Sequence, residues 1–396
     1  MQGCCCRNAW DIEVEDDIAD NILSLDWHKC SSLPDNAVSP FEYSKTEKNK
    51  LVLKTVGDAC SFLADDGKCR LQNKYGFDVK PHACRTFPFS FAGTPDGIHI
   101  GLSFACPAVC SGKGKIVSEH KRMLEKLLED AVDPWPVAEP VKLDLTTALE
   151  WEEYNSIEKG LSEILGNEAE SLKVCLAAGH TWLGMLRRML LAAPSEKKKI
   201  INFYLSSTAA DNYAKAFASA KKKPVRHPLK RILLGTCISF RHSMRPGQSR
   251  ISVTAKLILN NIRHWLQAGS VKMYPLDTGV PYIALALSSE LLQNKDAEKL
   301  LRRYFLHALS RKDLIVETDL FWGYCYFILS YGLIEWYAAA LQEAGSPPDP
   351  EKALMLVEKN FVSHSNFNRI FLSQPVLENK FRSIFEKPNF ARLMLS

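Results

Sequence analysis

The sequence has little net charge, and nothing in it suggests a nucleic-acid binder. Its 50 lysines and arginines are set against 45 aspartates and glutamates, which leaves a formal charge of +5. Proteins that bind nucleic acid usually carry a much larger local basic excess, so we expect no nucleic-acid partner. The densest basic run, KKKPVRHPLKR (221–231), has only Phe217 as a nearby aromatic neighbour and is typical of a solvated loop.

An apolar leader is also missing. The first residues, MQGCCCRNAWDIEVEDD, turn acidic at once and contain no apolar run of the length that a secretory signal needs, so we expect a cytoplasmic protein. The longest apolar stretch, 321–341, is long enough to cross a bilayer but contains Glu335 and four tyrosines. We interpret it as a buried helix of a soluble domain and expect no membrane span.

A third absence concerns nucleotide cofactors. No G-x-G-x-x-G motif follows a predicted strand, and the GKG at 112–114 is too short to count as one. The chain is nevertheless long and rich in hydrophobic residues. Its 396 residues, 46% of them hydrophobic, are enough for two or three domains with real cores.

Cysteine is concentrated at one end of the chain. Nine of the twelve cysteines lie within the first 110 residues: Cys4, Cys5, Cys6, Cys30, Cys60, Cys69, Cys84, Cys106 and Cys110. Disulfides do not persist in a reducing compartment, so a local cluster of this kind more often indicates metal or redox chemistry. For the remaining three, Cys175, Cys237 and Cys325, we expect small buried hydrophobic side chains.

The first part of the chain carries strand and turn signals. KLVLKTV (50–56) has strand composition, FLADDGKCRL (62–71) contains an Asp-Gly turn, and FPFSFAGTPDGIHIGLSF (87–104) alternates apolar residues around a Pro-Asp-Gly turn. We predict two hairpins here. Their turns would bring cysteines that are distant in sequence close together.

From Val117 onward the periodicity becomes helical. The helix predicted over SEHKRMLEKLLEDAV (118–132) ends at the proline-rich break DPWPVAEP (133–140). Further segments repeat apolar residues at spacings of three and four: 149–165, 168–193, 253–267, 296–309 and 349–361. Before the last of these, Asp349 and Pro350 form a helix start.

These patterns predict a mainly α protein. We assign residues 1–115 to a small, turn-rich α+β domain that contains the cysteine cluster, and residues 116–396 to a domain built as a helical bundle. The change of pattern lies between Lys115 and the proline-rich break.

About four soft ligands are needed for a tetrahedral zinc site or an iron-sulfur cluster, and the first segment has more than enough thiols. The spacing of Cys60, Cys69 and Cys84 does not match a zinc ribbon, and no CxxxCxxC triplet is present. The spacing therefore leaves the identity of the metal open.

The same stretch resembles a known family. CSFLADDGKCRLQNKYG (60–76) and KPHACRTFPFSF (80–91), with a CC pair upstream and LSFACP downstream, resemble the YkgJ-type zinc- or iron-chelating cysteine-cluster domain. The segment 300–336 is similar to the C-terminal helical region of flagellin lysine-N-methylases of the FliB type. The two similarities extend over most of the chain, and the middle region matches poorly.

The resemblance implies a cofactor bound by cysteine, either zinc or an iron-sulfur cluster, with 4Fe-4S the favoured form. Carried over to this sequence, the metal ligands are Cys5, Cys6, Cys60, Cys69 and Cys84, with Cys106 a further candidate. It also implies methyl transfer from S-adenosylmethionine to lysines of flagellin or another surface-filament protein. The chain departs from the family at its start, where members have a longer leader before the CC pair and a Gly-Trp soon after it.

Residues beside the cysteines are compatible with this interpretation. Arg85, Lys68 and Arg70 would offset the negative charge of several thiolates, and Phe87, Pro88 and Phe89 would exclude water. Each of these side chains is also compatible with an ordinary surface or core role. Trp10 and Tyr75 could stack on a cationic group, but ordinary packing is the favoured interpretation, because aromatic side chains bury large areas in any case.

Two hypotheses of different class follow. The first is a protein lysine N-methyltransferase that uses S-adenosylmethionine and a cysteine-bound cofactor. The second is a non-catalytic metal-binding or electron-carrying module whose helical domain docks a partner. The sequence offers no residue that we can assign as a catalytic base or as a binding residue for the methyl donor.

Overall fold

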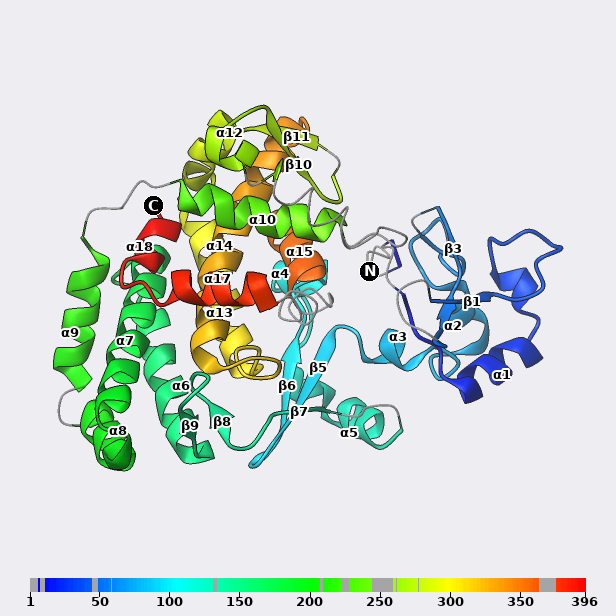
Figure 1. The fold of residues 1–396 in the computed structure, drawn as a ribbon. Helices are drawn as coiled ribbons and strands as arrows, with labels where there is room; N and C mark the ends of the chain where they lie inside the picture. The colour runs from blue at the N-terminus through cyan, green and yellow to red at the C-terminus, as the bar shows by residue number, and fades with distance from the viewer. Residues whose placement is uncertain are drawn as a thin grey trace. The chain divides into compact units, whose positions relative to one another are not determined.

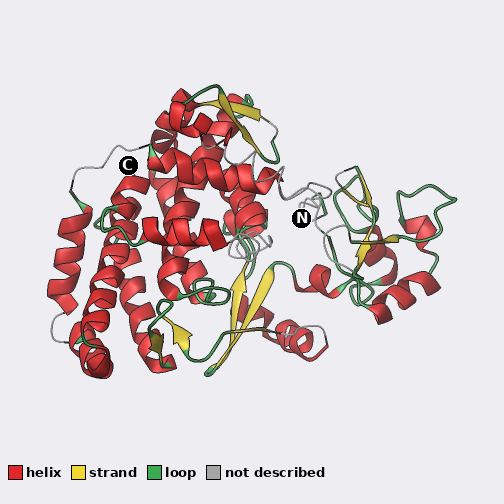
Figure 2. Cartoon of the chain, in the orientation of Figure 1, coloured by secondary structure: helices red, strands yellow, loops and turns green. Residues whose placement is uncertain are grey.

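The computed structural model describes residues 6–7, 11–44, 49–57, 59–130, 134–206, 209–222, 228–243, 259–260, 262–276, 278–362 and 375–396. The chain divides into two compact units. Unit 1 comprises Met1–Phe91 and Leu102–Pro134, and unit 2 comprises Ala92–Gly101 and Trp135–Ser396. Helices predominate and the sheets are small (Figure 2), which confirms the prediction of a mainly α fold.

Unit 1 is built from short elements joined by turns. Its helices are α1 (Asp16–Ser24), η1 (Trp27–Cys30), α2 (Arg70–Tyr75), α3 (His82–Thr86), α4 (Pro107–Cys110), η2 (Val117–His120) and α5 (Lys121–Asp130). Its strands are β1 (Phe41–Tyr43), β2 (Leu51–Leu53), β3 (Thr55–Val56) and β4 (Ala59–Cys60). Each pairs with its neighbour in sequence, β1 with β2 and β3 with β4, in antiparallel register.

A small apolar cluster holds unit 1 together. Helix α1 contributes Ile18 and Ile22, one turn apart on one face, and Trp27, Phe62 and Leu71 pack against them. Only ten buried residues make up this cluster, among them Cys30. A core of this size buries little apolar surface, so another source of stability is expected for the segment.

The predicted hairpin around Pro95 is present. Strands β5 (Phe89–Thr94) and β6 (Gly97–Leu102) are neighbours in a three-stranded sheet, and β7 (Trp135–Pro136) pairs in parallel with β5. Gly97 has a φ of 133°, a conformation that L side chains rarely adopt. Helix α5, which the sequence patterns assign to the second domain, belongs to unit 1, where Lys126 lies 3.4 Å from Asp78.

Unit 2 contains the long helices. They are α6 (Trp151–Leu165), α7 (Leu172–Ala192), η3 (Pro194–Glu196), α8 (Lys197–Leu205), α9 (Ala209–Ala220), α10 (Leu229–Ser243), α12 (Tyr282–Leu287), η4 (Ser288–Leu292), α13 (Lys295–Ser310), α14 (Leu320–Glu343), α15 (Pro350–Phe361), α17 (Pro375–Phe385) and α18 (Phe390–Met394). Two hairpins accompany them, β8 (Val141–Lys142) with β9 (Ala148–Leu149) and β10 (Ser270–Met273) with β11 (Thr278–Pro281). Part of the helix predicted over 253–267 lies outside the described residues.

Helix α14 is the central element of unit 2. It packs between α7 and α15 and also contacts α10, α17 and α18 (Figure 1). Every residue from Leu320 to Leu341 is buried, as predicted for this apolar stretch. Within the described part of the chain, no helix combines the length and apolar character needed to span a membrane.

The one carboxylate inside α14 is compensated. Glu335 is fully buried, with Lys173 Nζ 2.7 Å from Oε1 and Lys230 Nζ 3.1 Å from Oε2. The Lys230 contact is also a hydrogen bond, whereas the Lys173 contact is an ion pair without hydrogen-bond alignment. The predicted start of α15 is confirmed, because the Asp349 side chain accepts a hydrogen bond from the backbone N–H of Lys352 and Pro350 occupies the first turn.

Candidate metal centre

A hairpin with a tight turn lies between Cys60 and Cys69. Leu63 and Cys69 form an antiparallel bridge, and the backbone N–H of Leu63 donates to Cys60 O at 2.9 Å. The turn contains Gly67, whose φ of 79° favours glycine. The predicted Asp-Gly turn is therefore present, with Cys69 on one arm, whereas Cys60 precedes the other arm and lies on β4, where it pairs with Thr55.

The other predicted ligands of this set come from separate segments. The Cys60 backbone N–H donates to Cys6 O at 2.8 Å, which places the backbone of Cys6 beside β4. Cys84 lies on α3, and the first residue of that helix, His82, donates its backbone N–H to the Glu15 carboxylate at 3.1 Å. Cys5 lies outside the described residues.

Three of these thiols share one environment. Cys60, Cys69 and Cys84 are all partly buried and pack against the apolar cluster of unit 1. Cys30, which the sequence reasoning counted among the nine but left out of the ligand set, is buried inside that cluster. The spacing of the cysteines in the sequence does not mark Cys30, because its place in the cluster depends on how η1 packs.

Cys106 stands apart from this set. It precedes α4 and is buried, but it is not among the residues that pack against the apolar cluster. Its neighbour in the CPAVC pair, Cys110, donates its thiol to Phe104 O at 2.9 Å. A thiol that donates a hydrogen bond carries its proton, so Cys110 stands in the structure as a small buried side chain.

Two buried polar atoms next to the cysteines lack partners among the described residues. One is Nε of Arg85, the residue after Cys84, which is only 8% exposed. The other is Oγ of Ser61, the residue after Cys60, which is fully buried. Buried donors without acceptors are costly, and a nearby anionic centre would satisfy them.

The other predicted cations are differently placed. Lys68 is exposed and its ammonium lies 3.2 Å from Asp66, whose pKa is lowered by hydrogen bonds from Lys68. Arg70 is partly buried at the start of α2. Phe87, Pro88 and Phe89 are partly buried. The ring centroids of Phe89 and His120 lie 5.5 Å apart, in an edge-to-face arrangement.

Tyr75 has an ordinary structural role. Its ring packs on the apolar cluster and its hydroxyl donates to Asp26 O at 3.1 Å. Lys74 lies 4.9 Å from the ring centroid, so an internal cation already faces it. Trp10 lies outside the described residues.

The cysteines of unit 2 are buried as expected. Cys175, Cys237 and Cys325 are fully buried, and burial raises the pKa of each thiol. Thiols of this kind stay protonated and do not bind metal readily. Cys175 differs from the other two in that its sulfur lies 3.5 Å from Arg302 Nη1 and contacts the backbone carbonyls of Asn167 and Glu170.

The donor set of unit 1 fits a thiophilic metal in its chemistry. Four thiols, Cys6, Cys60, Cys69 and Cys84, come from turns and short elements, and the unpartnered donors of Arg85 and Ser61 stand next to two of them. Among the side chains that the structure describes, no three His, Cys, Asp or Glu residues form a group close enough to hold a metal ion. Cys4 and Cys5 lie outside the described residues.

Comparison of the chain with protein-family models, with curated proteins and with solved structures found no match.

Proposed function

We propose that this chain is a protein lysine N-methyltransferase that carries a cysteine-bound metal cofactor in unit 1. The observation that carries the metal part is the pair of buried, unpartnered donors, Arg85 Nε and Ser61 Oγ, each adjacent to a predicted ligand. The activity rests on the resemblance of the cysteine motif and of the segment 300–336 to FliB-type flagellin lysine-N-methylases. The proposed setting is the cytoplasm.

The proposed ligands are Cys6, Cys60, Cys69 and Cys84, together with Cys5. Thiolates bind zinc or assemble iron-sulfur clusters, and either cofactor would cross-link the short elements of unit 1 when bound. Cys106 is a weaker candidate than the sequence motif implies, because it does not pack with the other three thiols.

The protein's own residues prepare this centre in two ways. Arg85, which follows Cys84 in the sequence and is only 8% exposed, would offset part of the negative charge of a centre held by thiolates. Phe62 and Leu71, each 1% exposed, form an apolar floor under the hairpin that bears Cys60 and Cys69. A low-dielectric floor strengthens the interaction between the arginine and the thiolates.

Methyl transfer from S-adenosylmethionine to a lysine of a filament protein such as flagellin requires a neutral amine and an in-line approach. A protein that only binds a metal would not need the helical unit 2. Its segment 300–336 forms most of α13 and about the first two thirds of α14, which build the core of unit 2. A non-catalytic metal or redox module remains the competing function, with unit 2 as a docking domain.

One experiment separates the two functions. The full chain is purified without oxygen, loaded with its metal, and incubated with flagellin and S-adenosylmethionine labelled in its methyl group. The methyltransferase proposal predicts labelled lysines on the filament protein and loss of labelling after the metal is removed. Metal-loaded protein that neither binds S-adenosylmethionine nor labels any lysine leaves the metal module as the function.

A further inference from the structure

Positive charge is concentrated in one stretch of the chain. Residues 212–276, the basic stretch, contain 13 lysines and arginines and no aspartate or glutamate. The rest of the chain then has 37 basic and 45 acidic residues. The near balance of charge over the whole chain therefore conceals a strongly basic stretch, which lies in unit 2.

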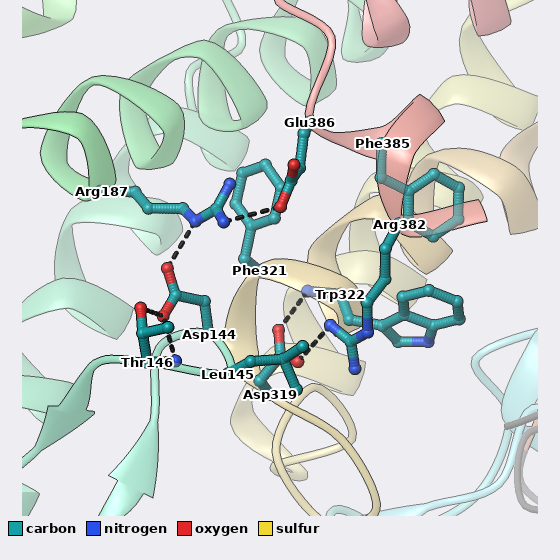
Figure 3. A pocket seen from close by; sticks show the side chains of 10 residues that line it. All are labelled: Asp144, Leu145, Thr146, Arg187, Asp319, Phe321, Trp322, Arg382, Phe385 and Glu386. Atoms are coloured by element: carbon teal, nitrogen blue, oxygen red, sulfur yellow. Dashed lines mark hydrogen bonds and ion pairs between the residues drawn. The ribbon is translucent and has the colours of Figure 1, made fainter. Parts of the chain in front are cut away.

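Elsewhere in unit 2, arginines are neutralised by carboxylates. The turn between β8 and β9, α7, the start of α14 and the end of α17 meet at a charged cavity that is lined by two arginines (Figure 3). Each has two carboxylate partners: Arg187 pairs with Asp144 and Glu386, and Arg382 pairs with Asp319 and Glu378. Neither arginine therefore needs an external anion.

The arginines of the basic stretch are different. Arg231, Arg241 and Arg263 have no carboxylate partner among the residues that the structure describes, and Nε of both Arg231 and Arg241 is buried there without any hydrogen-bond partner. Two lysines of the stretch, Lys221 and Lys230, do pair with carboxylates. Much of the positive charge of the stretch is thus left for an anion outside unit 2.

The basic stretch also contains a helix with an exposed apolar face. Residues 259–260 and 262–266, the Trp265 segment, are helical. Leu259, Ile262, Trp265 and Leu266 recur at helical spacing, and each is between 49% and 61% exposed. His264, on the opposite face, is buried. A helix on the surface of a domain usually turns its polar face outward, whereas this one turns its apolar face outward.

Helix α12 carries a second exposed apolar face. Ile283 is 74% exposed and Leu287, one turn later, is 55% exposed. The Trp265 segment and α12 are joined through their buried sides, where His264 Nδ1 and the Tyr282 hydroxyl lie 2.7 Å apart. The His264 ring also packs so closely on Gly235 of α10 that a Cβ there would lie 2.5 Å from it. The apolar patch, made of the exposed apolar side chains of both helices, is therefore anchored to the core of unit 2.

Positive charge lies at the same junction. Burial raises the pKa of Tyr282, and the positive charges of Arg263 and Arg231 oppose this shift, so both cations lie near the hydroxyl. Lys272 is exposed on β10, whose partner β11 leads directly into α12. Figure 1 shows α10, α12 and the β10–β11 hairpin together at one end of unit 2. Cations thus flank the apolar patch.

A partner for this surface must be both anionic and apolar. Most contacts to a nucleic-acid duplex go to phosphates and base edges, which give exposed leucine and isoleucine side chains little to pack against. The surface of a bilayer that contains anionic lipid offers both features. Tryptophan and aliphatic side chains enter the boundary between headgroups and acyl chains, and arginine and lysine contact the lipid phosphates.

We propose that the apolar patch and its flanking cations dock the protein on the surface of a bilayer that contains anionic lipid. The docked protein lies on the bilayer and does not cross it. The surface belongs to unit 2, and the proposal depends neither on the metal centre nor on methyl transfer.

The test is flotation of the full chain with two kinds of vesicle, phosphatidylcholine alone and phosphatidylcholine mixed with phosphatidylserine. We expect binding to the vesicles that contain phosphatidylserine, binding at least tenfold weaker to phosphatidylcholine alone, and a marked loss of binding at high salt because salt screens the cations. Fluorescence anisotropy with a labelled DNA duplex gives the competing case. Tighter binding to the duplex than to the vesicles would overturn the proposal in favour of nucleic acid.

Two variants and one control locate the binding. Trp265→Ser should weaken vesicle binding about tenfold because it removes the largest apolar side chain of the patch. Arg263→Gln should weaken it about fivefold. The control is Trp135→Ser on β7, which removes another exposed tryptophan of unit 2, 55% exposed, and should leave binding unchanged. Circular dichroism checks that all three variants, which change exposed side chains, keep the helical fold.

Three further results would overturn the proposal. The first is a wild-type chain that does not float with phosphatidylserine vesicles. The second is equal vesicle binding by Trp265→Ser and Trp135→Ser. The third is a wild-type dimer that Trp265→Ser alone makes monomeric in analytical ultracentrifugation, because a second copy of the chain would then cover the patch.

Discussion

Cysteine has different surroundings in the two units, and the difference separates two roles of the same residue. In unit 2, Cys175, Cys237 and Cys325 are fully buried and their pKa values are raised by burial. In unit 1, Cys60, Cys69 and Cys84 are only partly buried, on turns and short elements, and two of them precede a residue with a buried donor that lacks an acceptor in the described part of the chain. A fully buried thiol stays protonated, whereas a partly buried thiol on a turn is more accessible to a metal.

The apolar cores of the two units differ in size. Unit 2 surrounds α14 with large, fully buried side chains such as Trp182, Trp336 and Tyr304, and its stability follows from that packing. Among the described residues of unit 1, the apolar cluster around α1 has ten buried members, and nine partly buried ones pack against it. We therefore expect the metal to hold unit 1 together and to contribute nothing to unit 2.

Removal of the metal should give the largest effect. We expect a chelator, with a reductant present, to make the backbone of unit 1 open to limited proteolysis while the long helices of unit 2 stay protected. The reason is that thiolate–metal bonds link segments that otherwise share a small core. Fragments identified by mass spectrometry check this, and equal protection of unit 1 with and without metal would contradict it.

The buried carboxylate of unit 2 gives the next effect. Glu335→Gln leaves Lys173 and Lys230 facing a neutral side chain inside the core, which should lower the free energy of unfolding of unit 2 by about 3 kcal/mol. Glu343→Gln, on the exposed end of the same helix, is the matched control and should change it by less than about 0.5 kcal/mol. Chemical denaturation measures both, and a similar loss in the two variants would count against the assigned pairing.

Acid should weaken unit 2 through its buried histidines. Burial lowers the pKa of His180 to about 4, while its backbone hydrogen bond to Phe385 O opposes the shift only in part. The unfolded chain, with a histidine pKa of about 6.5, binds more protons, so stability is lost as the pH falls from about 6.5 to 4, by about 3 kcal/mol in total.

The variant His180→Gln should flatten this pH dependence without abolishing it. Burial also lowers the pKa of His264 to about 4, and that residue remains in the variant. Thermal unfolding of unit 2 between pH 4 and 7 measures the slope. An unchanged slope in the variant would show that His180 is not the group that titrates.

Replacing Arg85 should change the stability of unit 1 by the smallest amount, and the sign of the change should depend on whether metal is bound. With metal bound, Arg85→Met removes a charge that the thiolates need and should destabilise unit 1 by about 1–3 kcal/mol. Without metal, the same change removes a buried guanidinium whose Nε has no acceptor among the described residues and should stabilise the unit. Lys68→Met, which alters an exposed ion pair, should be near neutral in both states, and an equal effect of Arg85→Met in both states would refute its role.

Much of the fold could be predicted from the sequence because it depends on local patterns. The unbroken apolar run gives α14, the Asp349-Pro350 start gives α15, and the turn residues give the hairpin of β5 and β6. The placement of α5 in unit 1 could not be read in this way. Helical periodicity shows that a helix forms but not which core its apolar face joins.

The same distinction between local sequence patterns and tertiary packing applies to the candidate sites. The turn that precedes Cys69 could be predicted from the sequence, because an Asp-Gly pair marks it. The burial of Cys30 in the same cluster, and the separation of Cys106 from it, depend on how short elements pack. The charged cavity of unit 2 joins four segments spread from Asp144 to Glu386, and no local signal marks such a meeting.

The central claim is that the cysteines of unit 1 bind a metal, and metal analysis of the full chain purified without oxygen tests it most directly. We measure zinc, iron and acid-labile sulfide together with the absorption spectrum, for the wild type, Cys60→Ser, Cys69→Ser, Cys84→Ser and the buried control Cys237→Ala. The account predicts a stoichiometric metal in the wild type and in the control, and its loss in the three serine variants. No bound metal in the wild type, or the same metal content in all five proteins, would contradict it.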